Sequence, residues 1–143
     1  MYPSHEKDVY GWAVHTAQLL RDKKMNEVDF DGIVEELEEM GISNKHALTS
    51  RLALVITHLL KWQFQTNKRG HSWKYTIEEQ RDEARNYLEE NPSLKSKLDE
   101  IMIKSYRSAM IKAAKETSLD KKTFPVQCPY TFEQIMNDEF YPE

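Results

Sequence analysis

The chain has 143 residues, the usual size of one compact domain, so a single domain over residues 1–143 is the first expectation. With 20 Lys and Arg against 24 Asp and Glu, the formal net charge of −4 offers no general basic field for nucleic acid, and four glycines exclude glycine-rich classes. No window approaches the roughly 18 consecutive apolar residues of a membrane span, and residues 1–8 lack the pattern of a secretion signal, so we expect a cytoplasmic protein with no membrane partner.

The first half of the chain shows the helical spacing of apolar residues, and no segment alternates like a half-buried strand. The first helix is predicted over residues 4–24. The second begins near residues 29–31, where aspartates can cap free amides, and ends at Gly41 in a left-handed stop. Its apolar stripe, which we expect to face the core, consists of Ile33, Val34, Leu37 and Met40.

The second half continues the same period through three more helices. The third, over residues 43–63, is capped by Ser43 and is apolar round much of its circumference, so we expect it to be the central helix. The fourth spans residues 72–91 and stops before Pro92, and the fifth spans residues 93–117. The sequence therefore predicts an all-α bundle of five main helices.

The C-terminal arm, residues 119–143, carries more aromatic residues than a solvated tail would. Thr131 and Gln134 fit a capping box for one short helix, and we expect the arm to pack across the bundle. Within it lies Cys128, the only cysteine, so no intramolecular disulfide can form. With no histidine near it in sequence, we interpret Cys128 as a small buried apolar residue.

Several short sequence motifs follow one another along nearly the whole chain. They are Asp8-Val9-Tyr10-Gly11-Trp12, Glu35-Glu36-Leu37-Glu38, Met40-Gly41, Ser50-Arg51-Leu52, His58-Leu59-Leu60-Lys61-Trp62-Gln63, Ser72-Trp73, Thr76-Ile77, Gln80-Arg81, Pro92-Ser93-Leu94, Glu116-Thr117, Phe124-Pro125 and Cys128-Pro129. In this joint order the chain resembles the bacterial family known as domain of unknown function 29. The resemblance implies a compact helical fold, and it implies no established activity.

One candidate site combines a carboxylate, a guanidinium and an imidazole. Arg51 and His58 are seven residues apart and share a face of the third predicted helix, while Glu36 lies at the margin of the second. Two helices joined by a short turn pack antiparallel, which would bring Glu36 toward Arg51 or His58. The set is either an ion pair that holds the helices together, half of a metal site or an acid/base pair.

We favour the structural interpretation of this set. Di-iron bundles need two Glu-x-x-His motifs, but the sequence has none, and no two histidines are three or four residues apart. We therefore expect no metal and no cofactor. A small metal-assisted enzyme at this cluster remains an alternative.

A second candidate is the uneven distribution of charge. Residues 26–40 hold seven acids and neither Lys nor Arg, and of these Glu35 and Glu39 point away from the apolar stripe. The stretch of residues 58–81 is instead basic and aromatic. Its candidate contact residues are Lys61, Lys68, Arg69 and Lys74.

The basic stretch has two interpretations. Cations beside aromatic rings are what a single-stranded nucleic acid would use, but Trp62 and Trp73 lie on apolar stripes, where we expect core residues. The acidic patch of one copy can also bind the basic patch of another, or either patch can bind a charged partner protein.

The sequence contains no nucleophile elbow, phosphate-binding glycine loop or dinucleotide fingerprint. We therefore favour a non-catalytic interaction or scaffold module that uses an unidentified protein partner or self-association. The alternatives are a nucleic-acid-associated factor that uses residues 61–74 and the metal-assisted enzyme described above.

Overall fold

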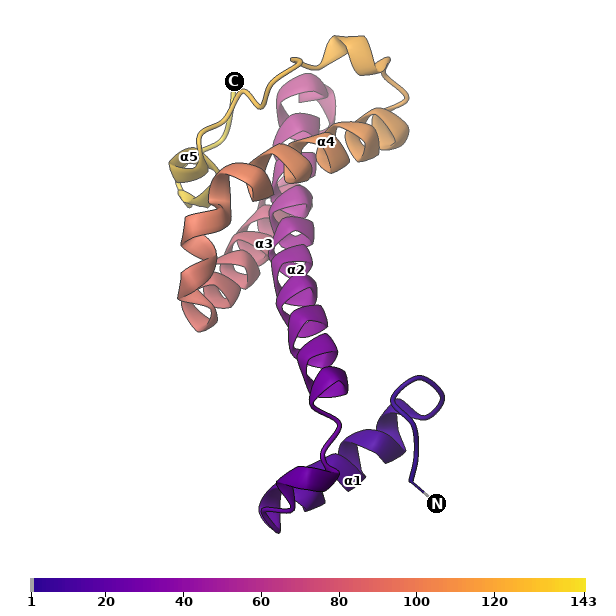
Figure 1. Cartoon of the computed structure of the whole chain (residues 1–143). Coiled ribbons are helices and arrows are strands. Elements are labelled where there is room, and N and C mark those ends of the chain that lie inside the picture. Colours follow the sequence, from indigo (N-terminus) through magenta and orange to yellow (C-terminus); the bar gives the residue numbers. More distant parts are fainter. Residues whose placement is uncertain (1) are drawn as a thin grey trace. The chain divides into compact units, whose positions relative to one another are not determined.

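The computed structural model describes residues 2–143, and every regular element in that range is helical, which confirms the all-α prediction (Figure 1). Short 3₁₀ turns separate the α-helices. The helices are α1 (Val9–Arg21), α2 (Phe30–Phe64), α3 (His71–Glu90), α4 (Leu98–Thr117) and α5 (Phe132–Met136).

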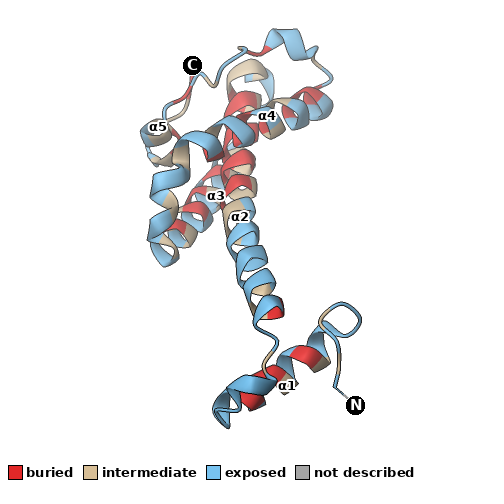
Figure 2. Cartoon of the chain, in the orientation of Figure 1, coloured by how far each residue is buried: buried red, intermediate tan, exposed pale blue. Residues whose placement is uncertain are grey.

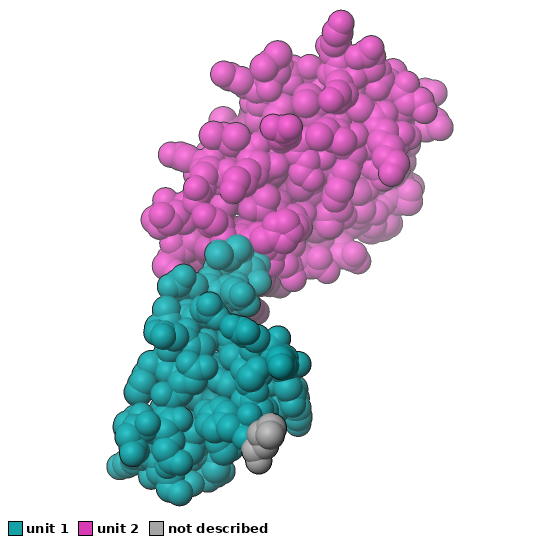
Figure 3. All heavy atoms as spheres, turned by 45° about the vertical axis from the view of Figure 1, so that its right-hand side comes forward, with its two compact units in different colours: residues 1–43 teal, residues 44–143 magenta. Residues whose placement is uncertain are grey.

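The chain divides into two compact units, unit 1 with residues 1–43 and unit 2 with residues 44–143 (Figure 3). Helix α2 contributes its first turns to unit 1 and its remaining turns to unit 2. A single domain over residues 1–143 stays a prediction.

The second and third predicted helices are one helix, α2, so the predicted stop at Gly41 and the predicted cap at Ser43 were wrong. A glycine ends a helix when it adopts a positive φ, but Gly41 has none. No proline follows Gly41 to interrupt the hydrogen bonds. A glycine inside a helix costs only about 0.5–1 kcal/mol, which the surrounding turns offset.

The first helix is shorter than predicted, because α1 begins at Val9 rather than near residue 4. The Asp8 carboxylate accepts a hydrogen bond of 2.9 Å from the backbone N–H of Gly11, which fixes the helix start. At the other end Lys23 has a φ of 58°, a left-handed conformation that terminates the helix.

Unit 1 buries few side chains. Its buried side chains on α1 are Trp12, Thr16 and Leu19. Helix α2 comes close to Trp12 at Gly32, where an added Cβ would lie 2.7 Å from Trp12 Cζ2. Asp29 caps this end of α2 by accepting a hydrogen bond of 3.0 Å from the backbone N–H of Gly32.

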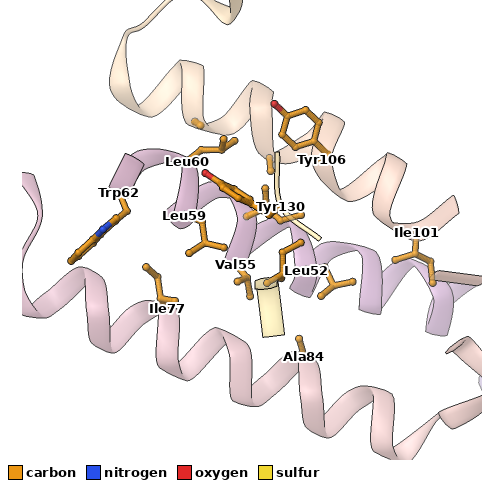
Figure 4. Packing of buried hydrophobic residues seen from close by; sticks show 14 of the residues in the cluster. Leu52, Val55, Leu59, Leu60, Trp62, Ile77, Ala84, Ile101, Tyr106 and Tyr130 are labelled. Carbon is orange, nitrogen blue, oxygen red and sulfur yellow. The ribbon is translucent and has the colours of Figure 1, made fainter. Parts of the chain in front are cut away.

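Unit 2 contains the main hydrophobic core. Leu52, Val55 and Leu59 of α2 are fully buried, and Ile77 and Ala84 of α3 point toward them (Figure 4). Figure 2 shows how buried positions cover the later turns of α2, whereas its first turns are exposed. The later turns thus form the central helix of unit 2, as predicted.

The C-terminal arm packs on this core. Phe124, Tyr130 and Ile135 are buried in it, and the Tyr130 hydroxyl donates to Gln63 Oε1 at 2.7 Å. The capping box of Thr131 and Gln134 is present at the start of α5.

Candidate interaction surfaces

The structure does not bring Glu36, Arg51 and His58 together. The prediction placed them on two antiparallel helices, but all three lie on the continuous helix α2, so the facing pair does not exist. This corrects the proposed Glu/His cluster between two helices. Among residues 2–143, no group of three His, Cys, Asp or Glu side chains is arranged to hold a metal ion.

Glu36 instead pairs with His5, a residue that the sequence analysis did not single out. Nε2 of His5 lies 2.7 Å from Glu36 Oε1, and Nδ1 lies 3.2 Å from Glu35 Oε2. The hydrogen bond with Glu36 is the largest cause that raises the pKa of His5, and the charges of Glu36, Glu35 and Asp29 add to it. The His5 ring also packs on Trp12, with 4.5 Å between ring centroids. His5 therefore ties the N-terminal segment to α2 within unit 1.

Arg51 and His58 make local contacts within unit 2. His58 Nδ1 lies 3.0 Å from the Leu54 carbonyl oxygen, one turn earlier in α2. The Arg51 guanidinium donates to the Ala47 carbonyl oxygen at 3.3 Å and covers the Tyr87 ring at 4.5 Å from its centroid. The polar contacts of both side chains are thus made within unit 2.

Cations of the basic stretch, residues 58–81, contact the C-terminal arm. Arg69 donates from Nε to the Trp62 carbonyl oxygen at 2.7 Å and from Nη2 to the Pro142 carbonyl oxygen at 3.4 Å. Lys74 Nζ lies 5.4 Å from the centroid of the Tyr141 ring. These cations are therefore engaged with their own chain.

The other members of the stretch differ in exposure. Trp62 is buried, with 8% of its surface exposed, and so belongs to the core, as predicted. Lys61 Nζ lies 5.2 Å from the centroid of the Trp73 ring and 3.9 Å from Glu116 Oε2. Lys68 is exposed. Without Trp62 as a stacking platform, the nucleic-acid interpretation loses one of its two aromatic surfaces.

Arg81 is a buried residue to which the sequence analysis assigned no role. It is fully buried, and its guanidinium donates to three backbone carbonyl oxygens of the arm, those of Ile135 at 2.6 Å, Phe140 at 2.8 Å and Gln134 at 3.3 Å. Burial lowers the pKa of the Arg81 guanidinium. A signal was present, since Arg81 shares the apolar stripe of α3 with the buried residues Ile77, Ala84 and Leu88.

The first turns of α2 expose an apolar stripe, named here the α2 apolar face (Phe30, Val34, Leu37 and Met40). Between 50% and 59% of each residue's surface is exposed. The prediction that the stripe of Ile33, Val34, Leu37 and Met40 faces the core was wrong for its last three residues, whereas Ile33 is half-buried. Unit 1 packs against α2 at Gly32, which lies on the opposite side of the helix at about 100° per residue.

Unit 1 as a whole is rich in exposed apolar side chains. Of the fifteen large apolar residues that are exposed among residues 2–143, eleven lie within residues 2–43. Residues 1–43 also carry ten Asp and Glu against four Lys and Arg. Unit 1 is thus acidic and apolar at once.

Unit 2 has an apolar groove of about 590 Å³ beside α4, named here the α4 groove. Met102, Tyr106, Met110 and Cys128 are its less exposed lining. Burial raises the pKa of Tyr106 to about 12, so its hydroxyl stays protonated and donates to the Pro125 carbonyl oxygen. Cys128 is half-buried rather than buried as expected, and its partial burial raises the pKa of the thiol.

The rim of the α4 groove is apolar and cationic. Ile103, Ile111 and Val126 are exposed there, Val126 to 94%. Arg107 and Lys121 are the only charged residues among the described ones that line the groove. Neither of them makes an ion pair within residues 2–143.

No helix among residues 2–143 combines the length and apolar character needed to cross a bilayer. Comparison with curated proteins and with solved structures found no match. The family model described as domain of unknown function DUF29 matches residues 4–141. Since the match extends over nearly the full length, from the turn before α1 to the arm beyond α5, the chain belongs to the DUF29 family.

Proposed function

We propose that this chain is a cytoplasmic, non-catalytic interaction or scaffold module, and that it binds a protein partner through the α2 apolar face. The observation that carries the proposal is the exposure of four large apolar side chains, each by half or more, along one side of a helix. Monomeric proteins rarely expose contiguous apolar surface of this kind, and burying it is worth about 25 cal/mol per Å².

The charge of unit 1 specifies the chemistry of that partner. Glu38 follows Val34 by one turn and borders the α2 apolar face, while Glu35 and Glu39 lie farther round the helix and are exposed. A surface with an apolar centre and an acidic margin attracts one with an apolar centre and a basic margin. We therefore expect the partner to present apolar residues flanked by Lys or Arg.

Affinity capture with the full-length chain tests the proposal. The variant Leu37→Ser with Met40→Ser removes apolar contacts, and Glu35→Lys with Glu39→Lys reverses the outer charge. Both are expected to lose a partner that the unaltered chain recovers from its own host, because each removes one half of the recognition. Since Glu35 also contacts His5, the variant Glu38→Lys, which reverses the charge that borders the face and leaves that contact intact, is expected to give the same loss. Tyr75→Ser is the matched control, since Tyr75 is 68% exposed on α3 and lies outside this face.

Two outcomes would contradict the proposal. One is recovery of the same proteins in the same amounts by the unaltered chain and by both face variants. The other is equal loss in the Tyr75→Ser control, which would indicate capture through any exposed apolar side chain. Circular dichroism of each variant should show unchanged helix content.

A further inference from the structure

The exposed apolar residues of this chain lie mainly in two places. Eleven of the fifteen lie in unit 1, four of them on the α2 apolar face, and three more, Ile103, Ile111 and Val126, lie on the rim of the α4 groove. Tyr75 is the single exposed large apolar residue among residues 2–143 outside these two places. The chain therefore carries two separate surfaces that are each suited to burial against something else.

The two surfaces have opposite charge. Asp31 and Glu38 border the α2 apolar face, whereas the charged residues that line the α4 groove are Arg107 and Lys121. Both cations lack an ion-pair partner within the described part of the chain. An acidic apolar helix is thus the complement of this groove.

We infer that the α4 groove receives the α2 apolar face of a second copy of this chain. The inference rests on the proposed function and names its partner. An amphipathic helix that lays spaced apolar residues into an apolar groove is a recurring mode of recognition, and residues 30, 34, 37 and 40 have the required spacing. Met102 and Met110 give the groove flexible walls that adjust to the entering side chains.

The size of the groove agrees with this occupant. A volume of about 590 Å³ is within the range of pockets that enclose drug-sized ligands, so several anchoring side chains fit. Because the two surfaces differ, a single contact is heterologous, and repeated head-to-tail contacts of this kind form a ring or an open filament. Only two copies that exchange the surfaces about a two-fold axis close a dimer.

Photo-crosslinking from the groove locates the contact. Val126→Cys, made together with Cys128→Ser, provides one thiol for benzophenone maleimide at the rim. This labelled chain is mixed with an unlabelled chain grown on heavy isotopes, irradiated and digested. We expect heavy-isotope peptides from residues 30–42 to be the main adducts. Tyr75→Cys with Cys128→Ser, labelled in the same way, is the control and should not give them.

Adducts confined to the labelled chain itself would overturn the inference, since they would place the α2 apolar face of the same copy in the groove. Adducts to heavy peptides outside unit 1, or equal adducts from the Tyr75→Cys control, would also overturn it. Isotope labelling separates these cases without knowledge of the register of the contact.

Sedimentation equilibrium tests the role of charge. We expect the unaltered chain to self-associate, and Arg107→Glu with Lys121→Glu to lower the association constant by about tenfold or more at low salt. The matched control is Lys112→Glu with Lys115→Glu, which reverses two exposed cations of α4 that do not line the groove and should have a smaller effect. A chain that stays monomeric at all concentrations, or equal losses in both variants, would overturn the inference.

The two proposals fail in different ways. If the chain is monomeric but the Leu37→Ser, Met40→Ser variant still loses a captured protein, the second copy is the wrong occupant and the interaction function stands. If that variant loses neither self-association nor a captured protein, both proposals fail.

Discussion

Arg81 shows how a single buried charge organises the C-terminal arm. A guanidinium enclosed by protein costs several kcal/mol unless its donors find acceptors, and here the acceptors are backbone carbonyl oxygens of residues 134, 135 and 140. Arg85 adds a bond of 2.9 Å to the Met136 carbonyl oxygen. The end of α5 thus receives two cations from α3, which also suits the negative end of its dipole.

Arg81→Met is expected to lower the free energy of unfolding by about 3 kcal/mol, because it removes the guanidinium donors of the Ile135 and Phe140 carbonyl oxygens, while the Gln134 carbonyl oxygen keeps the Asn137 N–H. Urea denaturation followed by circular dichroism measures the change. Arg21→Met, at an exposed position of α1, is the matched control and should stay within about 0.5 kcal/mol of the unaltered chain. Equal stability of the two variants would show that the contacts of Arg81 contribute nothing net.

His5 gives unit 1 a dependence on pH. Its pKa is raised by the bond to Glu36 and by the charges of Glu36, Glu35 and Asp29, while the remaining neighbour, Trp12, carries no charge. A raised pKa means that the protonated ring favours the folded state. This stabilisation is present in full below the ordinary His pKa of about 6.5 and is lost as the pH rises through the raised value.

We therefore expect His5→Gln to accelerate amide hydrogen exchange in residues 9–21 at acidic pH, and to have a smaller effect above the raised pKa of His5. Mass spectrometry of the exchanged chain measures this as a ratio of variant to unaltered protein at each pH. His46→Gln, at an exposed position of α2, is the control. A ratio that does not change with pH would exclude a role of the charged ring.

At the scale of elements, the sequence predicted that helices exist but not where one of them is interrupted. The glycine at position 41, with a serine two residues later, fits both an end followed by a new cap and an uninterrupted helix. Only the backbone conformation decides between these cases, and at Gly41 it is helical. The candidate site at Glu36 and His58 required a turn between two helices. Because α2 is continuous, that site does not form.

Gly41→Ala is expected to stabilise α2 by about 0.5–1 kcal/mol, because an added Cβ meets no atom within 4 Å and alanine is the better helix former. Gly32→Ala is the contrasting variant and should destabilise unit 1, since its Cβ would lie 2.7 Å from Trp12 Cζ2. Hydrogen exchange of residues 30–43 measures both. Stabilisation by both alanines would contradict the close approach at Gly32.

At the scale of the whole molecule, sequence patterning identified the core of unit 2 and misassigned unit 1. The stripe from Leu48 to Trp62 and the aromatic arm are buried as their spacing indicates. Phe30, Val34, Leu37 and Met40 have equally good spacing, but spacing alone does not say whether a partner surface comes from the same chain.

The anchoring of Arg81 has a consequence for synthesis on the ribosome. Its acceptors at residues 134, 135 and 140 are made more than fifty residues after the guanidinium itself. Until they emerge, the Arg81 guanidinium lacks these acceptors and has to keep its bound water. The growing chain can therefore form its helices early. Unit 2 excludes water from its core and completes its packing only when the arm has been translated.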